Sequence, residues 1–263
     1  MPVTPSLGVV FRPQTVPERL PEIARRAEQA GVAELWLWED CFLDGAMATS
    51  TLALASAERL TVGVGLLPVP LRNPALAAME LATVARVFPD RFTPALGHGV
   101  LEWMAQVGRR VASPMTLLRE HTVAIRALLA GSSVSTSGRY VNLDAVQLDR
   151  PPASPPPVLI GARGPKTLRL AGEVADGVNL DSGHTPASQR EALAHVNEGR
   201  AERGEHSFRV VTYVEIDTTA GSLKERIVDE AGALGEAGAD VVVFLGSSAA
   251  PDPDPLVEAM GAI

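Results

Sequence analysis

Residues 28–38 read Glu-Gln-Ala-Gly-Val-Ala-Glu-Leu-Trp-Leu-Trp, which is the end of a helix, a glycine and then an apolar strand. Between Leu20 and Ala27, apolar side chains recur at helical spacing, and Gly31 suits the left-handed turn that ends a helix. The apolar run 34–38 is typical of a parallel strand that is covered on both faces. The stretch therefore predicts a helix that returns the chain to a buried parallel sheet.

The same helix–glycine–strand joint recurs at Glu236-Ala-Gly238, near the other end of the chain. Short apolar runs predict eight strands, at residues 7–11, 34–38, 60–66, 92–96, 158–161, 177–180, 208–216 and 240–245. After the helix that ends at Gly31, helical patterns lie at about 48–57, 74–88, 114–130, 165–175, 187–203 and 222–237. Eight strands with intervening helices predict an α/β fold, the parallel (β/α)8 barrel. An open doubly wound sheet is the alternative, but it normally has fewer strands, and no Gly-x-Gly-x-x-Gly follows the first strand.

One region departs from this pattern. Residues 132–150 alternate in polarity around Ser137-Gly138, which predicts a small β-hairpin inserted before the fifth strand. The proline-rich run 151–157 that follows is typical of a domain linker. Because β/α units resume directly after it, we expect residues 1–263 to form a single barrel domain.

The composition excludes several classes of protein. Of the 263 residues, 46% are hydrophobic and 21% are charged, as in folded globular chains. The formal net charge of -8 argues against nucleic acid as a partner, because phosphate binding needs a basic surface. Cys41 is the only cysteine, which excludes an internal disulfide and suits a reducing compartment. With no signal peptide pattern and no apolar run of about 18 residues, we expect a cytoplasmic protein without a membrane partner.

In a barrel of this type, the active site lies at the carboxyl ends of the strands. Glu39-Asp40-Cys41 follows the second strand, where an acid either binds a ligand or caps a turn. Cys41 has no evident His–Asp partner set, which disfavours a cysteine nucleophile. On the second strand itself, Trp36 and Trp38 share a face, and we expect both to pack in the core or against helices.

Two further strand ends carry glycines. Gly161-Ala-Arg-Gly-Pro165 follows a strand and opens a helix, so its backbone N–H groups and Arg163 are suited to a phosphate, although a plain tight turn has the same pattern. His98 lies between two glycines and is either a ligand contact or a turn residue. The remaining histidines lack metal-ligand spacing, so we expect no metal site.

Taken together, these segments resemble the luciferase-like monooxygenase superfamily of flavin- and deazaflavin-dependent barrels. The resemblance spans nearly the whole chain and is nearest to the branch that uses the deazaflavin coenzyme F420. It is carried by residues 28–36, Trp38-Glu-Asp40, 61–65 with Arg72-Asn-Pro74, Pro89-Asp-Arg91 through Gly99, 157–165 and 171–177.

The resemblance implies a cofactor site. It assigns Asp40 to the cofactor ring and Gly65-Leu66 to a bulge that often holds a non-proline cis peptide. It also assigns the remaining cofactor wall to His98, Gly99, Ala162, Arg163, Gly164 and Asp181. It further implies coenzyme F420, with FMN as the alternative, a small organic substrate and a homodimer. Cys41 and His98 are the candidate catalytic groups for proton transfer.

Three positions depart from relatives with known substrates. Cys41 stands where many deazaflavin relatives have histidine, Val100 where the sugar-phosphate dehydrogenases have glutamate, and His184 where they have a phosphate-binding lysine. A sugar-phosphate dehydrogenase is therefore not expected. Hydride-transfer oxidoreductase is the leading hypothesis, with a monooxygenase if the cofactor is FMN. The alternatives are a non-redox barrel enzyme for a phosphorylated metabolite and a non-catalytic flavin-binding protein.

Overall fold

In the computed structural model, which describes residues 4–201, 203–204 and 206–263, eight parallel strands close into a barrel. Around the barrel the order is β1-β10-β9-β8-β7-β4-β3-β2, and Ser6 pairs with Val241 to close it. The barrel strands are β1 (Ser6–Val10), β2 (Glu34–Leu37), β3 (Thr61–Pro68), β4 (Phe92–Gly97), β7 (Leu159–Ala162), β8 (Gly177–Leu180), β9 (Arg209–Glu215) and β10 (Val241–Leu245). The predicted (β/α)8 barrel is confirmed, and the open sheet was the wrong alternative.

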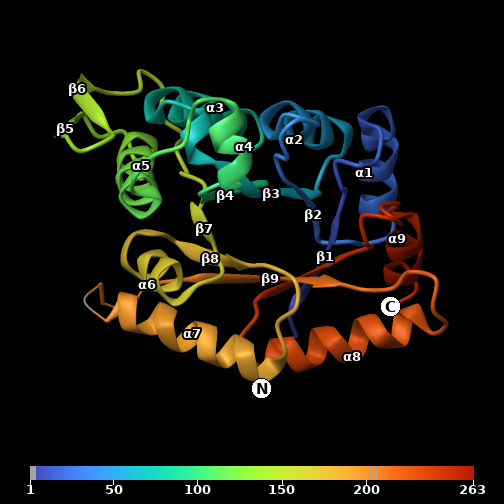
Figure 1. The fold of residues 1–263 in the computed structure, drawn as a ribbon. Coiled ribbons are helices and arrows are strands. Elements are labelled where there is room, and N and C mark those ends of the chain that lie inside the picture. The colour runs from blue at the N-terminus through green and yellow to red at the C-terminus, as the bar shows by residue number, and fades with distance from the viewer. Residues whose placement is uncertain (1–3, 202, 205) are drawn as a thin grey trace.

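The helices form a layer around this barrel (Figure 1). They are α1 (Leu20–Gln29), α2 (Ala46–Ser56), α3 (Pro74–Val87), α4 (Leu101–Gln106), α5 (Pro114–Leu129), α6 (Pro165–Val174), α7 (Pro186–Arg200), α8 (Leu223–Glu236) and α9 (Asp254–Met260), with short 3-10 turns at Pro17–Arg19 and Val69–Leu71. Seven of them agree closely with the helical patterns of the sequence. The two shortest, α4 and α9, were missed because six or seven residues do not establish a helical period.

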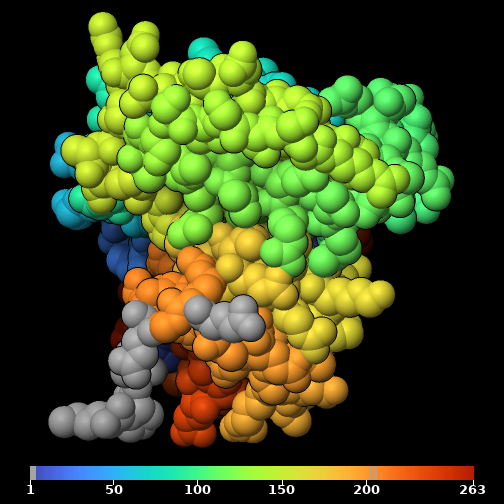
Figure 2. All heavy atoms as spheres, turned by 90° about the vertical axis from the view of Figure 1, so that its left-hand side faces the viewer, coloured from blue at the N-terminus to red at the C-terminus, as the bar shows by residue number. Residues whose placement is uncertain are grey.

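The region between β4 and β7 forms the predicted hairpin, from β5 (Val134–Ser137) and β6 (Asn142–Val146). On this side of the molecule, α5 and the hairpin lie above α6 and α7 (Figure 2). The proline-rich run 151–157 leads from the two-stranded hairpin sheet into β7, and Ala95 of β4 pairs with Leu159 of β7 in the barrel. The run therefore returns the chain to the same barrel and does not lead into a second barrel.

Glycines on inward-facing strand positions make room for large side chains in the barrel. A Cβ at Gly63 would overlap the ring of Trp36, which is fully buried. Towards the carboxyl ends, the side chain of Leu66 fills the space over Gly97 and Gly161 in the same way. The lower barrel is therefore packed, and open space remains only above Leu66.

The amino end of the barrel is closed by a polar cluster. The buried carboxylate of Glu34 pairs with Arg209 and accepts a hydrogen bond of 2.9 Å from Nε1 of Trp36. Arg209 also donates to Thr93 over 3.1 Å. Burial raises the pKa of Glu34, and the positive charge of Arg209 opposes that rise. The paired charges therefore have a structural role, and we call this cluster the barrel plug.

Candidate functional site

A cavity of about 580 Å³ opens at the carboxyl ends of the barrel strands, where barrel enzymes hold their active sites. It is lined by Arg12, Trp38, Glu39, Asp40, Gly65, Leu66, Pro68, His98, Gly99, Val100, Trp103, Gly161, Ala162, Arg163, Gly164, Thr167, Asn179, Asp181, Ser182, Tyr213 and Leu245. All nine predicted cofactor residues are in this set, so one cavity brings together segments from five strands, β2, β3, β4, β7 and β8.

Past β2, Asp40 is oriented by an aromatic side chain. Its carboxylate accepts a hydrogen bond of 2.9 Å from Nε1 of Trp38. The Trp38 ring lies under the guanidinium of Arg12, 5.3 Å from the ring centroid. Trp38 therefore lines the cavity and packs only partly on the core, whereas Trp36 alone is a core residue as expected.

Arg12 is itself fixed by two acceptors at the neighbouring strand ends. Its Nε donates to the carbonyl of Gly246 over 2.6 Å, and its Nη2 pairs with Glu215 over 2.6 Å. Burial lowers the pKa of Arg12, while Glu215 and Asp40 act in the opposite direction. Arg12 thus holds the Trp38–Asp40 unit in place and remains charged.

Glu39 has a structural role next to this unit. Its two carboxylate oxygens accept hydrogen bonds of 2.6 and 2.9 Å from the guanidinium of Arg72. One oxygen also accepts from the backbone N–H of Ala46, which anchors the start of α2. With both oxygens engaged, Glu39 fixes the loop, and Asp40 is the acid available to a ligand.

The floor of the cavity is formed by Leu66 and two polar groups from β8 and β9. The peptide bond between Gly65 and Leu66 is cis, as the family resemblance implies. The hydroxyl of Tyr213 donates to the carbonyl of Gly65 over 3.3 Å, and burial raises the pKa of Tyr213 well above its usual range. Asn179 is only 5% exposed, and its Nδ2 atom is buried without a hydrogen-bond partner. A buried donor without a partner is costly, so a ligand acceptor is the natural partner for this amide.

His98 extends from the loop after β4. Gly99, with φ of +69°, makes the left-handed turn that leads from this loop to α4. The Nε2 atom of His98 lies 3.5 Å from Oγ1 of Thr167, and its Nδ1 atom is buried without a partner. Burial lowers the pKa of His98, so the imidazole is neutral at pH 7.

The opposite wall is the loop from β7 to α6. Gly164 caps α6 without a side-chain hydrogen bond, and no atom lies within 4 Å of a Cβ built there. This leaves an open approach to the positive end of the helix dipole. Arg163 forms an ion pair with Asp181 but is otherwise exposed. The Nε2 atom of His184 lies 3.7 Å from Oδ1 of the same carboxylate.

Cys41 is not among the residues that line the cavity. Burial raises the pKa of its thiol, and the carboxylates of Glu39 and Asp40 raise it further. At neutral pH the group is therefore a protonated thiol beside the site.

Sequence reasoning missed several lining residues, among them Asn179 and Tyr213. Both are polar side chains at inward positions of buried strands, and this was the available signal, because a buried polar residue on a barrel strand points to the interior. From the sequence, Arg12 could be recognised only as the residue that follows the first strand, without any sign of its contacts in the cavity. Thr167 and Trp103 lie on helices, and no local pattern indicates that they face the cavity.

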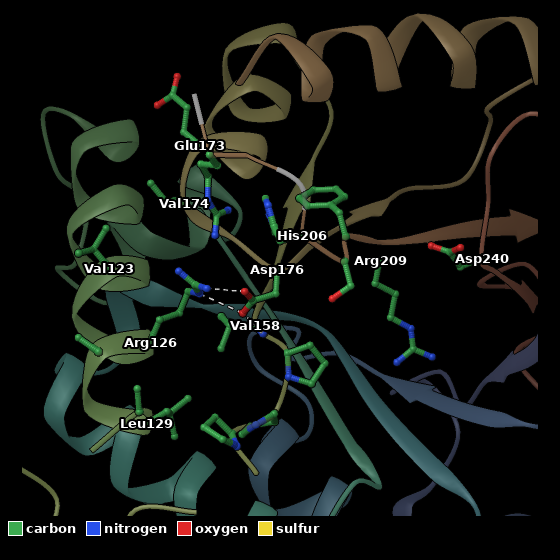
Figure 3. Close-up of a pocket in the computed structure, with 18 residues that line it drawn as sticks. Val123, Arg126, Leu129, Val158, Glu173, Val174, Asp176, His206, Arg209 and Asp240 are labelled. Atoms are coloured by element: carbon green, nitrogen blue, oxygen red, sulfur yellow. Dashed lines mark hydrogen bonds and ion pairs between the residues drawn. The ribbon is translucent and has the colours of Figure 1, made fainter. Parts of the chain in front are cut away.

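A larger cleft, of about 1180 Å³, lies at the opposite end of the barrel between α5, the end of α6 and the start of β9 (Figure 3). Its charged groups are satisfied within the protein: Arg126 pairs with Asp176 through a hydrogen bond of 2.9 Å, and Arg209 joins the barrel plug. The amino-terminal face of such barrels serves stability, so this cleft is not the candidate active site.

Two further observations concern the described part of the chain. Over those residues, no group of three or more His, Cys, Asp or Glu side chains is arranged to hold a metal ion. The same residues include no helix with the length and apolar character needed to cross a membrane.

Proteins with named activities are similar to this chain in sequence. The chain is 26% identical over 247 residues to a 5,10-methylenetetrahydromethanopterin reductase of Methanolobus tindarius, covering 94% of this chain and 73% of that protein. It is 31% identical over 194 residues to an F420-dependent hydroxymycolic acid dehydrogenase of Mycobacterium tuberculosis, covering 67% of this chain and 52% of that protein.

Solved structures agree in fold. A coenzyme F420-dependent tetrahydromethanopterin reductase from Methanopyrus kandleri superposes with a TM-score of 0.84, at 20% identity and 98% coverage of both chains. An F420-dependent secondary alcohol dehydrogenase superposes with a TM-score of 0.85, at 19% identity, covering 99% of this chain and 98% of that chain. Across residues 5–242, the sequence matches the profile of luciferase-like monooxygenases, and the chain belongs to that family.

Proposed function

We propose that this protein is a coenzyme F420-dependent oxidoreductase, which transfers hydride between the deazaflavin and a small organic substrate. The observation that carries the proposal is the cavity itself, where the nine predicted cofactor residues line one space. Relatives named as F420-dependent dehydrogenases support the choice of cofactor over FMN.

The unpaired groups of the cavity fit an anionic, heteroatom-rich cofactor. Asn179 and His98 each present a buried nitrogen without a partner, and both suit the polar edge of the ring system. The open cap of α6 at Gly164 suits a phosphate, because backbone N–H groups and the helix dipole attract negative charge. This local attraction offsets the net charge of -8 of the chain.

When bound, the deazaflavin accepts or donates hydride, and the protein supplies orientation and proton transfer. Asp40, Asn179 and the Gly65–Leu66 segment would hold the ring side, and the α6 cap would hold the phosphate. Neutral His98 accepts a proton when a substrate hydroxyl is oxidised and returns it in the reverse direction. Cys41 stays a second candidate for proton transfer. Full turnover in both Cys41→Ser and His98→Ala would overturn the two roles.

Titration of the purified protein with coenzyme F420 and with FMN, read by absorbance and fluorescence, tests the proposal. We expect micromolar binding of coenzyme F420, and Gly164→Asp to weaken it by tenfold or more through charge repulsion at the α6 cap. Gly232→Asp on α8 is the matched control, since that glycine is also free of neighbours within 4 Å. If neither cofactor binds at micromolar concentration, the proposal fails. Binding without turnover across a substrate panel would favour a non-catalytic flavin-binding protein.

The remaining predictions about the whole protein are part of the same proposal. We propose that the barrel acts as a single domain and as a homodimer, without nucleic acid or membrane partners. An exposed apolar stripe on α3, formed by Leu76, Met79 and Val87, supports the dimer. The cytoplasmic location stays a prediction from the sequence.

A further inference from the structure

Exposed apolar side chains gather on the loops around the cavity mouth. Over the described residues, thirteen large apolar side chains are exposed, and six of them follow β1, β2 or β4: Val16, Phe42, Leu43, Val100, Leu101 and Val107. Phe42 is 66% exposed and Leu43 is 54% exposed, only two and three residues beyond Asp40. Single exposed apolar residues are ordinary, but a group on the rim of a cavity marks a binding surface.

One member of this group, Val100, also belongs to an apolar wall inside the cavity. Trp38, Leu66, Pro68, Val100 and Trp103 line the part of the cavity formed by β2, β3 and the loop into α4. The polar loop Gly161–Gly164 and Asp181 lie on the other side, at β7 and β8. The cavity therefore has a side suited to an anionic cofactor and a side that is mostly apolar and bordered by Asp40 and His98. We call Phe42, Leu43, Val100 and Leu101 the mouth patch.

The charges of the cavity leave no cation for an anionic substrate. Of the arginines that line it, Arg12 is paired with Glu215, and Arg163 is paired with Asp181 on the cofactor side. Asp40 borders the apolar side, and no ion pair with it is found within the described part of the chain. A substrate phosphate or carboxylate on this side would be repelled by this carboxylate, while the nearby Arg12 is already paired with Glu215.

We propose that the substrate is a neutral organic molecule with an apolar body of several carbons, which lies on the mouth patch and the adjoining wall. This inference rests on the proposed function, because it assigns the β7–β8 side to the cofactor. The reacting carbon enters beside Leu66 and His98, and the apolar body extends towards Phe42 and Leu101. Burial of each methylene on this surface favours binding in proportion to the area removed from water.

A series of straight-chain alcohols from 1-butanol to 1-octanol tests the inference, with glucose 6-phosphate as the anionic probe. Binding is read from tryptophan fluorescence, since Trp38 and Trp103 line the cavity, both with and without coenzyme F420. We expect affinity to rise about two- to fourfold for each added methylene, with no binding of glucose 6-phosphate over the same range. The double variant Phe42→Ser/Leu101→Ser should lose most of this rise and bind coenzyme F420 as the parent does.

Val228→Ser on α8 is the matched control, because that side chain is 45% exposed and distant in sequence from the mouth loops. Thermal melts confirm that all variants are folded before titration. Two results would overturn the inference: glucose 6-phosphate binding more tightly than hexanol, or an unchanged chain-length dependence in the double variant. Conversion of a dimer to a monomer by the double variant would also overturn it, by making the patch a subunit contact. The cofactor titration is separate, so its failure would count against the proposed function alone.

Discussion

Asn179 is the residue whose chemistry is least explained by the protein alone. Its Nδ2 is a buried donor without a partner on the cavity floor, whereas the neighbouring Tyr213 hydroxyl has the Gly65 carbonyl. In the proposed function, loss of this amide removes a hydrogen bond to the bound cofactor. The arrangement therefore separates binding from stability at a single position.

Asn179→Leu should accordingly weaken cofactor binding by about three- to tenfold, the range of one neutral hydrogen bond, and leave the melting temperature unchanged or slightly higher. Fluorescence titration and a thermal melt measure the two effects independently. A variant that binds the cofactor with parental affinity would show that the amide has no ligand partner.

His98 gives a pH dependence with a defined sign. Its ordinary pKa of about 6.5 is lowered by burial, so the neutral form persists into mildly acidic solution. For alcohol oxidation the imidazole must be neutral, and kcat/KM should therefore fall only as the pH drops below about 6.5. In His98→Asn this acid limb should disappear together with most of the rate. An acid limb that stays in the variant would assign it to another group.

At the scale of elements, α6 and α7 cross unusually closely. A Cβ on Gly172 would overlap the carbonyl of Val196, and a Cβ on Gly199 would overlap the carbonyl of Arg169. Both overlapping atoms are backbone carbonyl oxygens, so they cannot move away by a side-chain rotation. Since α6 begins at the Gly164 cap, where we propose that a phosphate binds, the crossing also fixes where Gly164 lies relative to β7.

Gly199→Ala should therefore destabilise the protein by about 1–3 kcal/mol, as overpacking does, and lower the melting temperature by several degrees. Gly232→Ala on α8 is the control with the opposite sign, because no atom lies within 4 Å of its Cβ and alanine is the better helix former. Equal melting temperatures for the two variants would contradict a close crossing.

The barrel could be predicted from the sequence more completely than the residues of its site. Buried parallel strands are apolar runs, so residues such as 241–245 were identified directly, and the strand ends then pointed to the cavity. Asn179 and Tyr213 were missed because both lie among apolar residues within their strands, and only the closed barrel turns them towards a ligand. The pairing of Glu39 with Arg72 joins residues 33 positions apart, and local patterns carry no information on such contacts.

At the scale of the whole molecule, the face of α3 carries an unpartnered apolar stripe. Leu76, Met79 and Val87 recur at three- and eight-residue intervals on one side of the helix, and they are 48%, 56% and 63% exposed. On α2, Leu52 is also exposed. A monomer would leave this surface in water, whereas a two-fold dimer covers the same patch on both chains.

Met79→Glu should therefore convert the dimer to a monomer, because two carboxylates would be buried against each other across the symmetry axis. Light scattering coupled to size exclusion measures the mass directly. Val228→Glu on α8 adds the same charge at an exposed valine and should leave the dimer intact. Because the mouth patch lies on other loops, Met79→Glu should keep the alcohol chain-length dependence. A parent protein that is already monomeric at micromolar concentration would contradict the dimer and leave the α3 stripe without a partner.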